Sequence, residues 1–269
     1  MKKVYALSLA LALLLALPAA LAESLPPWEY PLDPEILSDF DQYITLTNRT
    51  HLLDSDYEPA DLVTATARRA KGTSAMQLRR EASDALNAMF DAASQAGYTL
   101  YLKSAYRSYR TQKTMYSNRL EKLGRDDGMV SYPGASDHQT GLGADILNYA
   151  WTLKDGMNKE FGKTEEAQWM EAHCAEFGFV LRYMEDKEEI TGIKFEPWHF
   201  RYVGLEAAAY MMENHLSLEE FTEEWQAYIQ DYEASGGDFQ ALLRWRSRIR
   251  DAVVVNRNED GDEEYSIFY

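Results

Sequence analysis

The segment SDHQTGLGAD, residues 136–145, combines small residues with side chains that can bind a metal or a proton. His138 lies near its start, and Asp145 follows seven residues later in otherwise apolar sequence. Residues 143–149 alternate in the way that is typical of a β-strand. A carboxylate buried in such a strand costs free energy unless it is paired or binds a metal. The segment therefore predicts a strand that carries part of a polar site into the core.

A second segment, FEPWHF at residues 195–200, places Glu196 and His199 in similar apolar surroundings. Two histidines and one aspartate would give zinc three protein ligands and an open fourth position for water, which is the catalytic pattern. Glu196 would then be the free carboxylate that takes a proton from this water. Residues three apart face opposite ways on a regular strand, but Pro197 cannot donate to a ladder. A bulge or strand end is therefore expected between Glu196 and His199.

Spacing alone does not distinguish this metal site from satisfied polar residues in the core. Acidic residues make up 44 of 269, so a histidine often meets one at a chosen offset by chance. His51, His173 and His215 occur in polar or helical surroundings, and we interpret them as structural or solvated.

A third segment, Tyr106-Arg107-Ser108, lies at a predicted strand-to-helix junction. Arg107 at this corner could hold a carboxylate or polarise a carbonyl group. The alternative is an ion pair on the surface.

Hydrophobic periodicity and Gly or Thr caps predict helices segregated around a few strands. The class expected from this order is α+β with a mainly antiparallel sheet. The predicted helices cover residues 74–96, 107–123, 164–177, 205–214 and 218–232, and the predicted strands cover residues 98–105, 143–149, 179–184 and 193–200.

The two ends of the chain differ in composition from its central part. Lys2 and Lys3, an apolar run and the small-x-small pattern of residues 20–22 predict a signal peptide over residues 1–22, with an uncleaved membrane anchor as the alternative. The protein is then expected outside the cytoplasmic membrane, secreted, in the cell wall or in the periplasm. Residues 23–44 are Pro-rich and predict a linker or arm. Residues 223–269, with 11 acidic residues and 5 arginines, predict an acidic helical extension.

The composition excludes several classes of function. A net charge of −17 argues against sequence-independent nucleic-acid binding and against docking on an anionic membrane. The single cysteine, Cys174, excludes an intramolecular disulfide and a multi-cysteine zinc site, and it is expected to be a small buried apolar residue. Membrane association is expected only if the N-terminal segment stays uncleaved, and a monomer is expected.

Taken together, the three segments resemble the VanY-type zinc D-alanyl-D-alanine carboxypeptidases, which share a superfamily with the VanX dipeptidases. The shared pattern is an upstream Y-R-S segment, S-x-H with an Asp seven residues after the His, and E-x-x-H, all present here in this order. The resemblance covers roughly residues 45–222, which we take as the catalytic domain. It implies the small α+β zinc-peptidase fold that is also found in the hedgehog signalling domain.

The resemblance also implies a role for each motif residue. It makes His138, Asp145 and His199 the ligands of a zinc ion (Zn2+), Glu196 the general base and later proton donor, and Arg107 the group that stabilises the developing oxyanion. Contacts to the substrate are assigned to Ser136, Gln112, Ser108, Tyr106 and Trp198. The implied substrates are peptidoglycan stem peptides that end in D-Ala.

The sequence leaves the specificity open. An L,D-carboxypeptidase acting on tetrapeptide stems and a D,D-dipeptidase would use the same chemistry, because loops around the pocket decide the stereochemistry. A non-catalytic module that binds the cell wall is a further alternative, but such a site has no need of the base Glu196.

Overall fold

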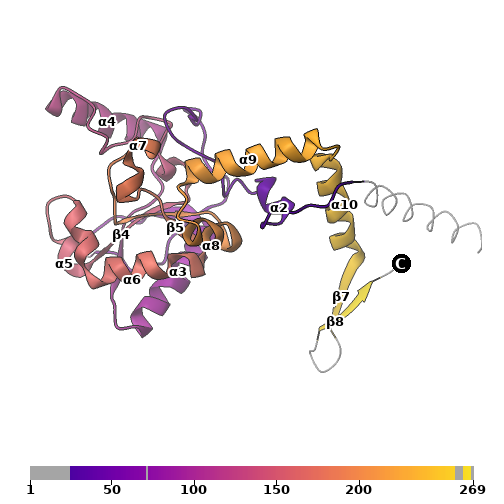
Figure 1. The fold of residues 1–269 in the computed structure, drawn as a ribbon. Coiled ribbons are helices and arrows are strands. Elements are labelled where there is room, and N and C mark those ends of the chain that lie inside the picture. The colour runs from indigo at the N-terminus through magenta and orange to yellow at the C-terminus, as the bar shows by residue number, and fades with distance from the viewer. Residues whose placement is uncertain (1–24, 71, 258–262, 268–269) are drawn as a thin grey trace, which may run out of the picture. The chain divides into compact units, whose positions relative to one another are not determined.

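The computed structural model describes residues 25–70, 72–257 and 263–267 (Figure 1). The predicted signal peptide, residues 1–22, lies outside these ranges. The described chain forms two compact units, one of residues 41–223 and one that combines residues 25–40 with those from 224 onward. No helix within the described ranges is both long and apolar enough to span a membrane.

A four-stranded antiparallel sheet is the centre of the larger unit. Its strand order is β3-β4-β6-β5, where the bounds are Leu100–Ser104 for β3, Gly143–Asn148 for β4, His199–Tyr202 for β6 and Phe179–Leu181 for β5. Strand β4 has a neighbour on each side and is buried along its whole length. Strands β1 (Leu62–Thr64) and β2 (Gln77–Arg79) form a separate antiparallel pair. This pairing confirms the predicted α+β class with a mainly antiparallel sheet.

Helices of the larger unit pack against this sheet (Figure 1). Helix α3 (Arg80–Gln95) buries Leu86, Met89 and Ala93 in the core that it shares with the sheet. It contacts α6 (Glu165–His173), while α8 (Leu205–Glu213) contacts β5. The remaining elements of this unit are α4 (Tyr109–Leu123), α5 (Tyr149–Thr152), α7 (Glu188–Thr191), the start of α9 (Leu218–Ala234), and the 3-10 turns η1 (Asp137–Thr140), η2 (Lys159–Lys163), η3 (Cys174–Phe177) and η4 (Glu185–Lys187).

Cys174 lies fully buried in the core, as the sequence predicted. Burial raises the pKa of its thiol to about 12, because the charged thiolate would lose its hydration. The thiol is therefore a packing group with little nucleophilic character at neutral pH.

Two predicted elements are wrong in part. The helix predicted over residues 74–96 begins only at Arg80, because residues 77–79 pair with β1. Leu78 fits the helical spacing of the apolar residues that follow, yet it reaches the same core from a strand. The strand predicted over residues 193–200 begins only at His199, because residues 196–199 form a turn in which the His199 N–H donates to the Glu196 carbonyl at 2.9 Å. The expected strand end after Pro197 is confirmed.

The smaller unit is built from both ends of the described chain. The Trp28 ring contacts the rings of Tyr228, Tyr232 and Phe239 at centroid distances of 4.9, 5.3 and 5.6 Å. The Tyr30 hydroxyl donates to Glu224 at 2.8 Å. The unit also contains α2 (Pro34–Leu37), α10 (Phe239–Ala252) and a hairpin of β7 (Val253–Arg257) with β8 (Glu263–Ile267). Trp28 and Tyr30 of the predicted arm thus contact residues of the predicted C-terminal extension.

Candidate active site

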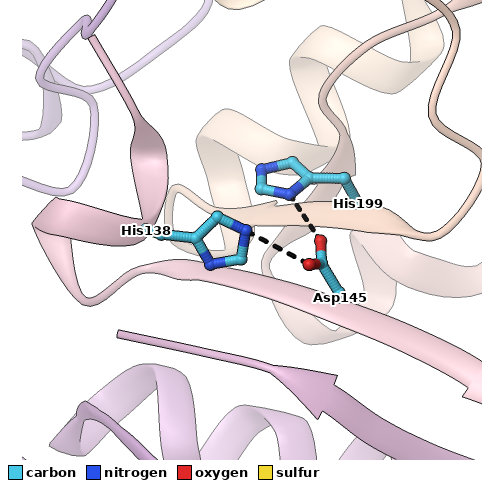
Figure 2. A group of neighbouring side chains, drawn as sticks. All are labelled: His138, Asp145 and His199. Atoms are coloured by element: carbon cyan, nitrogen blue, oxygen red, sulfur yellow. Dashed lines mark hydrogen bonds and ion pairs between the residues drawn. The ribbon is translucent and has the colours of Figure 1, made fainter. Parts of the chain in front are cut away.

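Three buried side chains converge where strands β4 and β6 lie next to the turn η1 (Figure 2). Asp145 and His199 are direct partners in the β4–β6 register, and His138 extends from η1. One ligand atom from each of the three residues lies within 4.8 Å of the other two. A Cβ on Gly143 would lie 3.1 Å from the backbone of Asp137, so this glycine lets β4 pass close to η1. The small residues of the motif therefore bring His138 to Asp145.

The hydrogen bonds of His138 define which of its nitrogens faces the site. Its Nδ1 lies 2.7 Å from the Ala105 carbonyl, which can only accept, so Nδ1 carries the proton. Its Nε2 is then the unprotonated nitrogen, 3.3 Å from Asp145 Oδ2. On the other side, His199 Nδ1 lies 2.9 Å from Asp145 Oδ1. Two imidazole nitrogens and one carboxylate thus face a common point, a donor set that could hold a divalent metal such as zinc.

The surroundings keep Asp145 and His138 in the protonation states that a metal requires. Burial alone would raise the pKa of Asp145, but the His138 and His199 imidazoles outweigh it and hold this pKa well below its ordinary range. Burial lowers the pKa of His138, and the nearby Arg107 cation lowers it further. At neutral pH the site therefore offers an ionised carboxylate and a neutral His138. Burial lowers the pKa of His199, but the Asp137 and Asp145 carboxylates outweigh it and raise this pKa to about 9, so a bound metal has to displace a proton from this ring.

Glu196 lies beside the three residues and lines the same cleft. The turn that precedes β6 orients it, because its N–H donates to the Tyr183 carbonyl at 3.1 Å and its carbonyl accepts from His199. Burial raises the pKa of Glu196 to about 8, with Asp145 adding to this effect and His199 opposing it. A carboxyl group with a pKa near the working pH is suited to exchange protons with a reacting molecule.

Arg107 points into this cleft, with 15% of its side chain exposed. Its Nη1 donates to Gln112 Oε1 at 2.7 Å, its Nη2 donates to Ser104 Oγ at 3.1 Å, and Nη2 lies 4.0 Å from Asp145 Oδ2. These contacts hold a cation at the wall of the site, where it can face a carbonyl or carboxylate oxygen.

The cleft has a volume of about 240 Å³ and includes two more of the predicted residues, Ser136 and Trp198. Gln112 is buried next to Arg107. Its Oε1 accepts from Arg107, and its Nε2 donates to the Ser131 carbonyl at 2.7 Å. Ser108 caps α4 through the Thr111 N–H. Burial raises the pKa of Tyr106, and the nearby Glu58 carboxylate raises it further. The structure thus brings together seven of the ten predicted residues and places Gln112, Ser108 and Tyr106 outside the lining of the cleft.

Several lining residues were missed by the sequence argument. Tyr183 stacks on the His199 ring with centroids 5.0 Å apart, and Arg119 stands in the wall in a two-bond contact with Asp127. Met115, Met129 and Met157 add an apolar side. A methionine or an arginine gives no local signal for a cleft, because only the fold decides which face it lies on. Asp137, which lies within the segment of residues 136–145, was also not predicted as part of the site.

Comparison with known proteins identifies the family of the chain. Residues 75–205 match the model of the VanY family, described as D-alanyl-D-alanine carboxypeptidase. The chain is 38% identical over 193 residues to "Putative carboxypeptidase YodJ" of Bacillus subtilis (strain 168), a match that covers 70% of each protein. A solved structure of the LdcB LD-carboxypeptidase is 40% identical with a TM-score of 0.62, covering 66% of this chain and 84% of that one.

A solved structure of the vancomycin-resistance D,D-pentapeptidase VanY in complex with Zn(II) is 29% identical with a TM-score of 0.54, covering 66% of this chain and 98% of that one. The solved relatives therefore share the fold, and residues 75–205, which match the family model, contain all three motif segments. This chain is a peptidase that belongs to the VanY family of D-alanyl-D-alanine carboxypeptidases.

Proposed function

We propose that the protein is a zinc-dependent carboxypeptidase that removes the C-terminal D-Ala from peptidoglycan stem peptides. The observation that carries this proposal is the convergence of His138, Asp145 and His199 beside Glu196 in one cleft. The donor set fits zinc, because both imidazoles are buried and a carboxylate completes the three protein ligands of a catalytic site. The zinc-containing VanY relative supports the same metal.

Each site residue has its own role in the proposed hydrolysis. Zinc, when bound by His138, Asp145 and His199, supplies a Lewis acid and lowers the pKa of water. Glu196 accepts a proton from the attacking water as the new C–O bond forms, and it returns this proton to the amine nitrogen as the C–N bond breaks. The Arg107 guanidinium faces the carbonyl oxygen as negative charge develops there. The products are a shortened peptide and free D-Ala.

An L,D-carboxypeptidase that trims tetrapeptide stems is the second candidate. It is favoured by the LdcB LD-carboxypeptidase, whose 40% identity exceeds the 29% of the D,D-pentapeptidase VanY. Both activities would use the same metal and base, so the residues described above do not separate them.

Digestion of purified muropeptides, followed by mass spectrometry, separates these activities. We expect the zinc-loaded protein to remove one alanine from pentapeptide stems. Removal of alanine only from tetrapeptide stems would establish the L,D activity instead, and release of an intact D-Ala-D-Ala dipeptide would establish a dipeptidase. Stable binding of muropeptides without cleavage would contradict an enzymatic role and favour a module that binds the cell wall.

The location of the protein follows from the same proposal. Because peptidoglycan is assembled outside the cytoplasmic membrane, we place the protein there, in line with the signal peptide predicted over residues 1–22. The intact mass of the protein recovered from cells would test this, since cleavage after Ala22 predicts a chain that begins at Glu23.

Substituting Arg107 by lysine tests the role of its guanidinium. Lysine keeps the charge but loses the planar group that contacts Gln112 and Ser104 at the same time. Transition-state stabilisation should fall by roughly 2–4 kcal/mol, the size seen when one oxyanion donor is removed. The loss should appear in kcat with KM nearly unchanged, because the interaction strengthens in the transition state. Steady-state kinetics on a D-Ala-D-Ala peptide would instead show a raised KM and an unchanged kcat if Arg107 anchors the terminal carboxylate.

A further inference from the structure

One ring nitrogen of His199 has no hydrogen bond in the site described above. Its Nδ1 faces Asp145, and its Nε2 is buried without a hydrogen bond. The Oδ2 atom of Asp137 lies 3.6 Å from this Nε2. We propose that Asp137 is a positioning residue, whose carboxylate accepts the Nε2–H of His199 and thereby keeps Nδ1 turned toward the metal. This inference rests on the zinc site of the proposed function.

The chemistry of imidazole requires such an acceptor. A neutral histidine carries one N–H, so the nitrogen that binds a metal is unprotonated and the other nitrogen must donate. Ligand histidines usually give this second proton to a carboxylate or a backbone carbonyl, which fixes the tautomer and the ring orientation. His138 has such an acceptor in the Ala105 carbonyl at 2.7 Å. Asp137 occupies the corresponding place for His199.

Asp137 is held in this place from several sides. Its Oδ2 accepts from Arg182 Nε at 3.0 Å and from the Tyr183 hydroxyl at 3.2 Å, and its Oδ1 accepts from Thr47 Oγ1 at 2.8 Å and from Arg201 Nη1. All of these groups are buried. The Arg182 and Arg201 guanidiniums thus pair with the buried Asp137 carboxylate from two sides. A carboxylate with so many partners cannot rotate away, and Tyr183 also stacks on the His199 ring.

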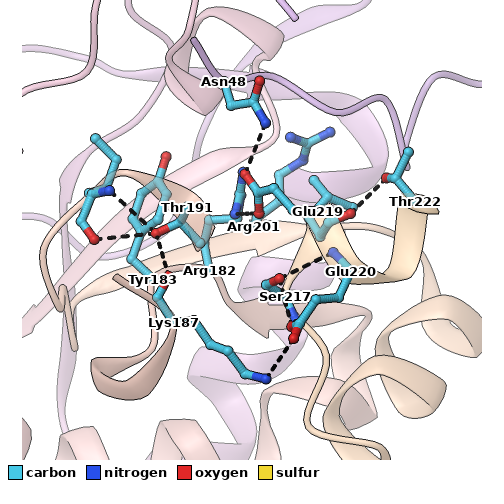
Figure 3. A network of polar contacts seen from close by, with 12 residues as sticks. Asn48, Arg182, Tyr183, Lys187, Thr191, Arg201, Ser217, Glu219, Glu220 and Thr222 are labelled. Carbon is cyan, nitrogen blue, oxygen red and sulfur yellow. Dashed lines mark hydrogen bonds and ion pairs between the residues drawn. The ribbon is translucent and has the colours of Figure 1, made fainter. Parts of the chain in front are cut away.

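Asp137 belongs to a buried cluster of four charges, which provides a matched control. Glu219 contacts Arg182 through two bonds of 2.8 Å and accepts from Asn48 at 3.3 Å (Figure 3). Asp137 and Glu219 thus balance Arg182 and Arg201, and removing either acid leaves the same excess of positive charge. No described contact joins Glu219 to His199. A role in charge balance alone would therefore make the two acids equivalent, whereas positioning of His199 depends on Asp137.

The test compares Asp137→Asn with Glu219→Gln for zinc affinity, measured by competition with a chromophoric chelator. We expect Asp137→Asn to bind zinc roughly 10- to 100-fold more weakly than the wild type, the usual effect of removing the partner of a ligand histidine. Glu219→Gln should bind zinc nearly as tightly as the wild type, although both variants should lose thermal stability. Cobalt-substituted Asp137→Asn should show altered visible absorption bands, because the orientation of one ligand changes, while Glu219→Gln should not.

Wild-type zinc affinity in Asp137→Asn, or equal losses in both variants, would overturn the proposal. If Asp137→Asn does not fold, the imidazole nitrogens of His199 are observed by NMR in the zinc-loaded wild type. A slowly exchanging Nε2–H supports the proposal, and a proton on Nδ1 overturns it. Absence of zinc binding by the wild type would contradict the proposed function itself, and the two failures are therefore distinguishable.

Discussion

Replacing Glu196 by glutamine is expected to abolish nearly all turnover while zinc remains bound. Glutamine has the same size, but it cannot accept a proton from water or return one to the leaving amine. Loss of a general base costs on the order of 10²–10⁴ in rate, and more when the same group also acts as the acid. Glu196 lies outside the group of three candidate ligands, so metal content should stay at the wild-type level. Release of D-Ala and the zinc content of the same preparation measure both quantities.

Glu185→Gln is the matched control for this variant. Glu185 is also a glutamate of the larger unit, but it is exposed and contacts only the exposed Lys159 at 3.5 Å among the ion pairs of the described residues. Its substitution should leave the rate unchanged. If Glu196→Gln loses zinc as readily as it loses activity, Glu196 is a ligand and the division of roles given above is wrong.

Replacing either His138 or His199 by alanine is expected to remove most of the metal at neutral pH. Each substitution deletes one of three protein ligands and leaves the Asp145 carboxylate short of one of its buried partners. The zinc content should fall from about one ion per chain toward zero, and activity should fall with it. Metal analysis of the purified variants, with circular dichroism to confirm that they are folded, tests this expectation.

His51→Ala provides the comparison, because His51 is an exposed histidine that bonds to Thr50 and Asn48 in a loop. It should retain zinc and activity. Full zinc occupancy in both His138→Ala and His199→Ala would contradict the ligand assignment.

Most of the site residues predicted from the sequence lie together in the structure, whereas some predicted bounds of helices and strands are wrong. The apolar surroundings of His138, Asp145, Glu196 and His199 marked them as candidates but left satisfied polar residues in the core as an alternative. Only the resemblance of the three segments, in their order, to a known family grouped them into one site. That Asp145 and His199 are register partners could not be predicted, since the chain between them is 53 residues long and the pairing depends on the whole sheet.

The errors have a common physical origin. Leu78 satisfies the helical spacing of residues 82–93 and equally satisfies a strand position that faces the same core, so periodicity could not locate the start of α3. Gln112 and Asp137 are polar residues whose partners come from distant segments. Their contacts with Ser131, Arg182 and Arg201 exist only in the folded chain, and a local motif cannot reveal them.

The order of the segments along the chain has a consequence for how the protein can be shortened. Residues 25–40 are synthesised before the larger unit, whereas their partners on α9 and α10 are synthesised after it. A version that ends at residue 223 would keep every residue of the proposed metal site and would leave Trp28 and Tyr30 without the aromatic rings that cover them. Large uncovered aromatic side chains promote aggregation. Trimming this protein for biochemical work should therefore remove both ends together or neither.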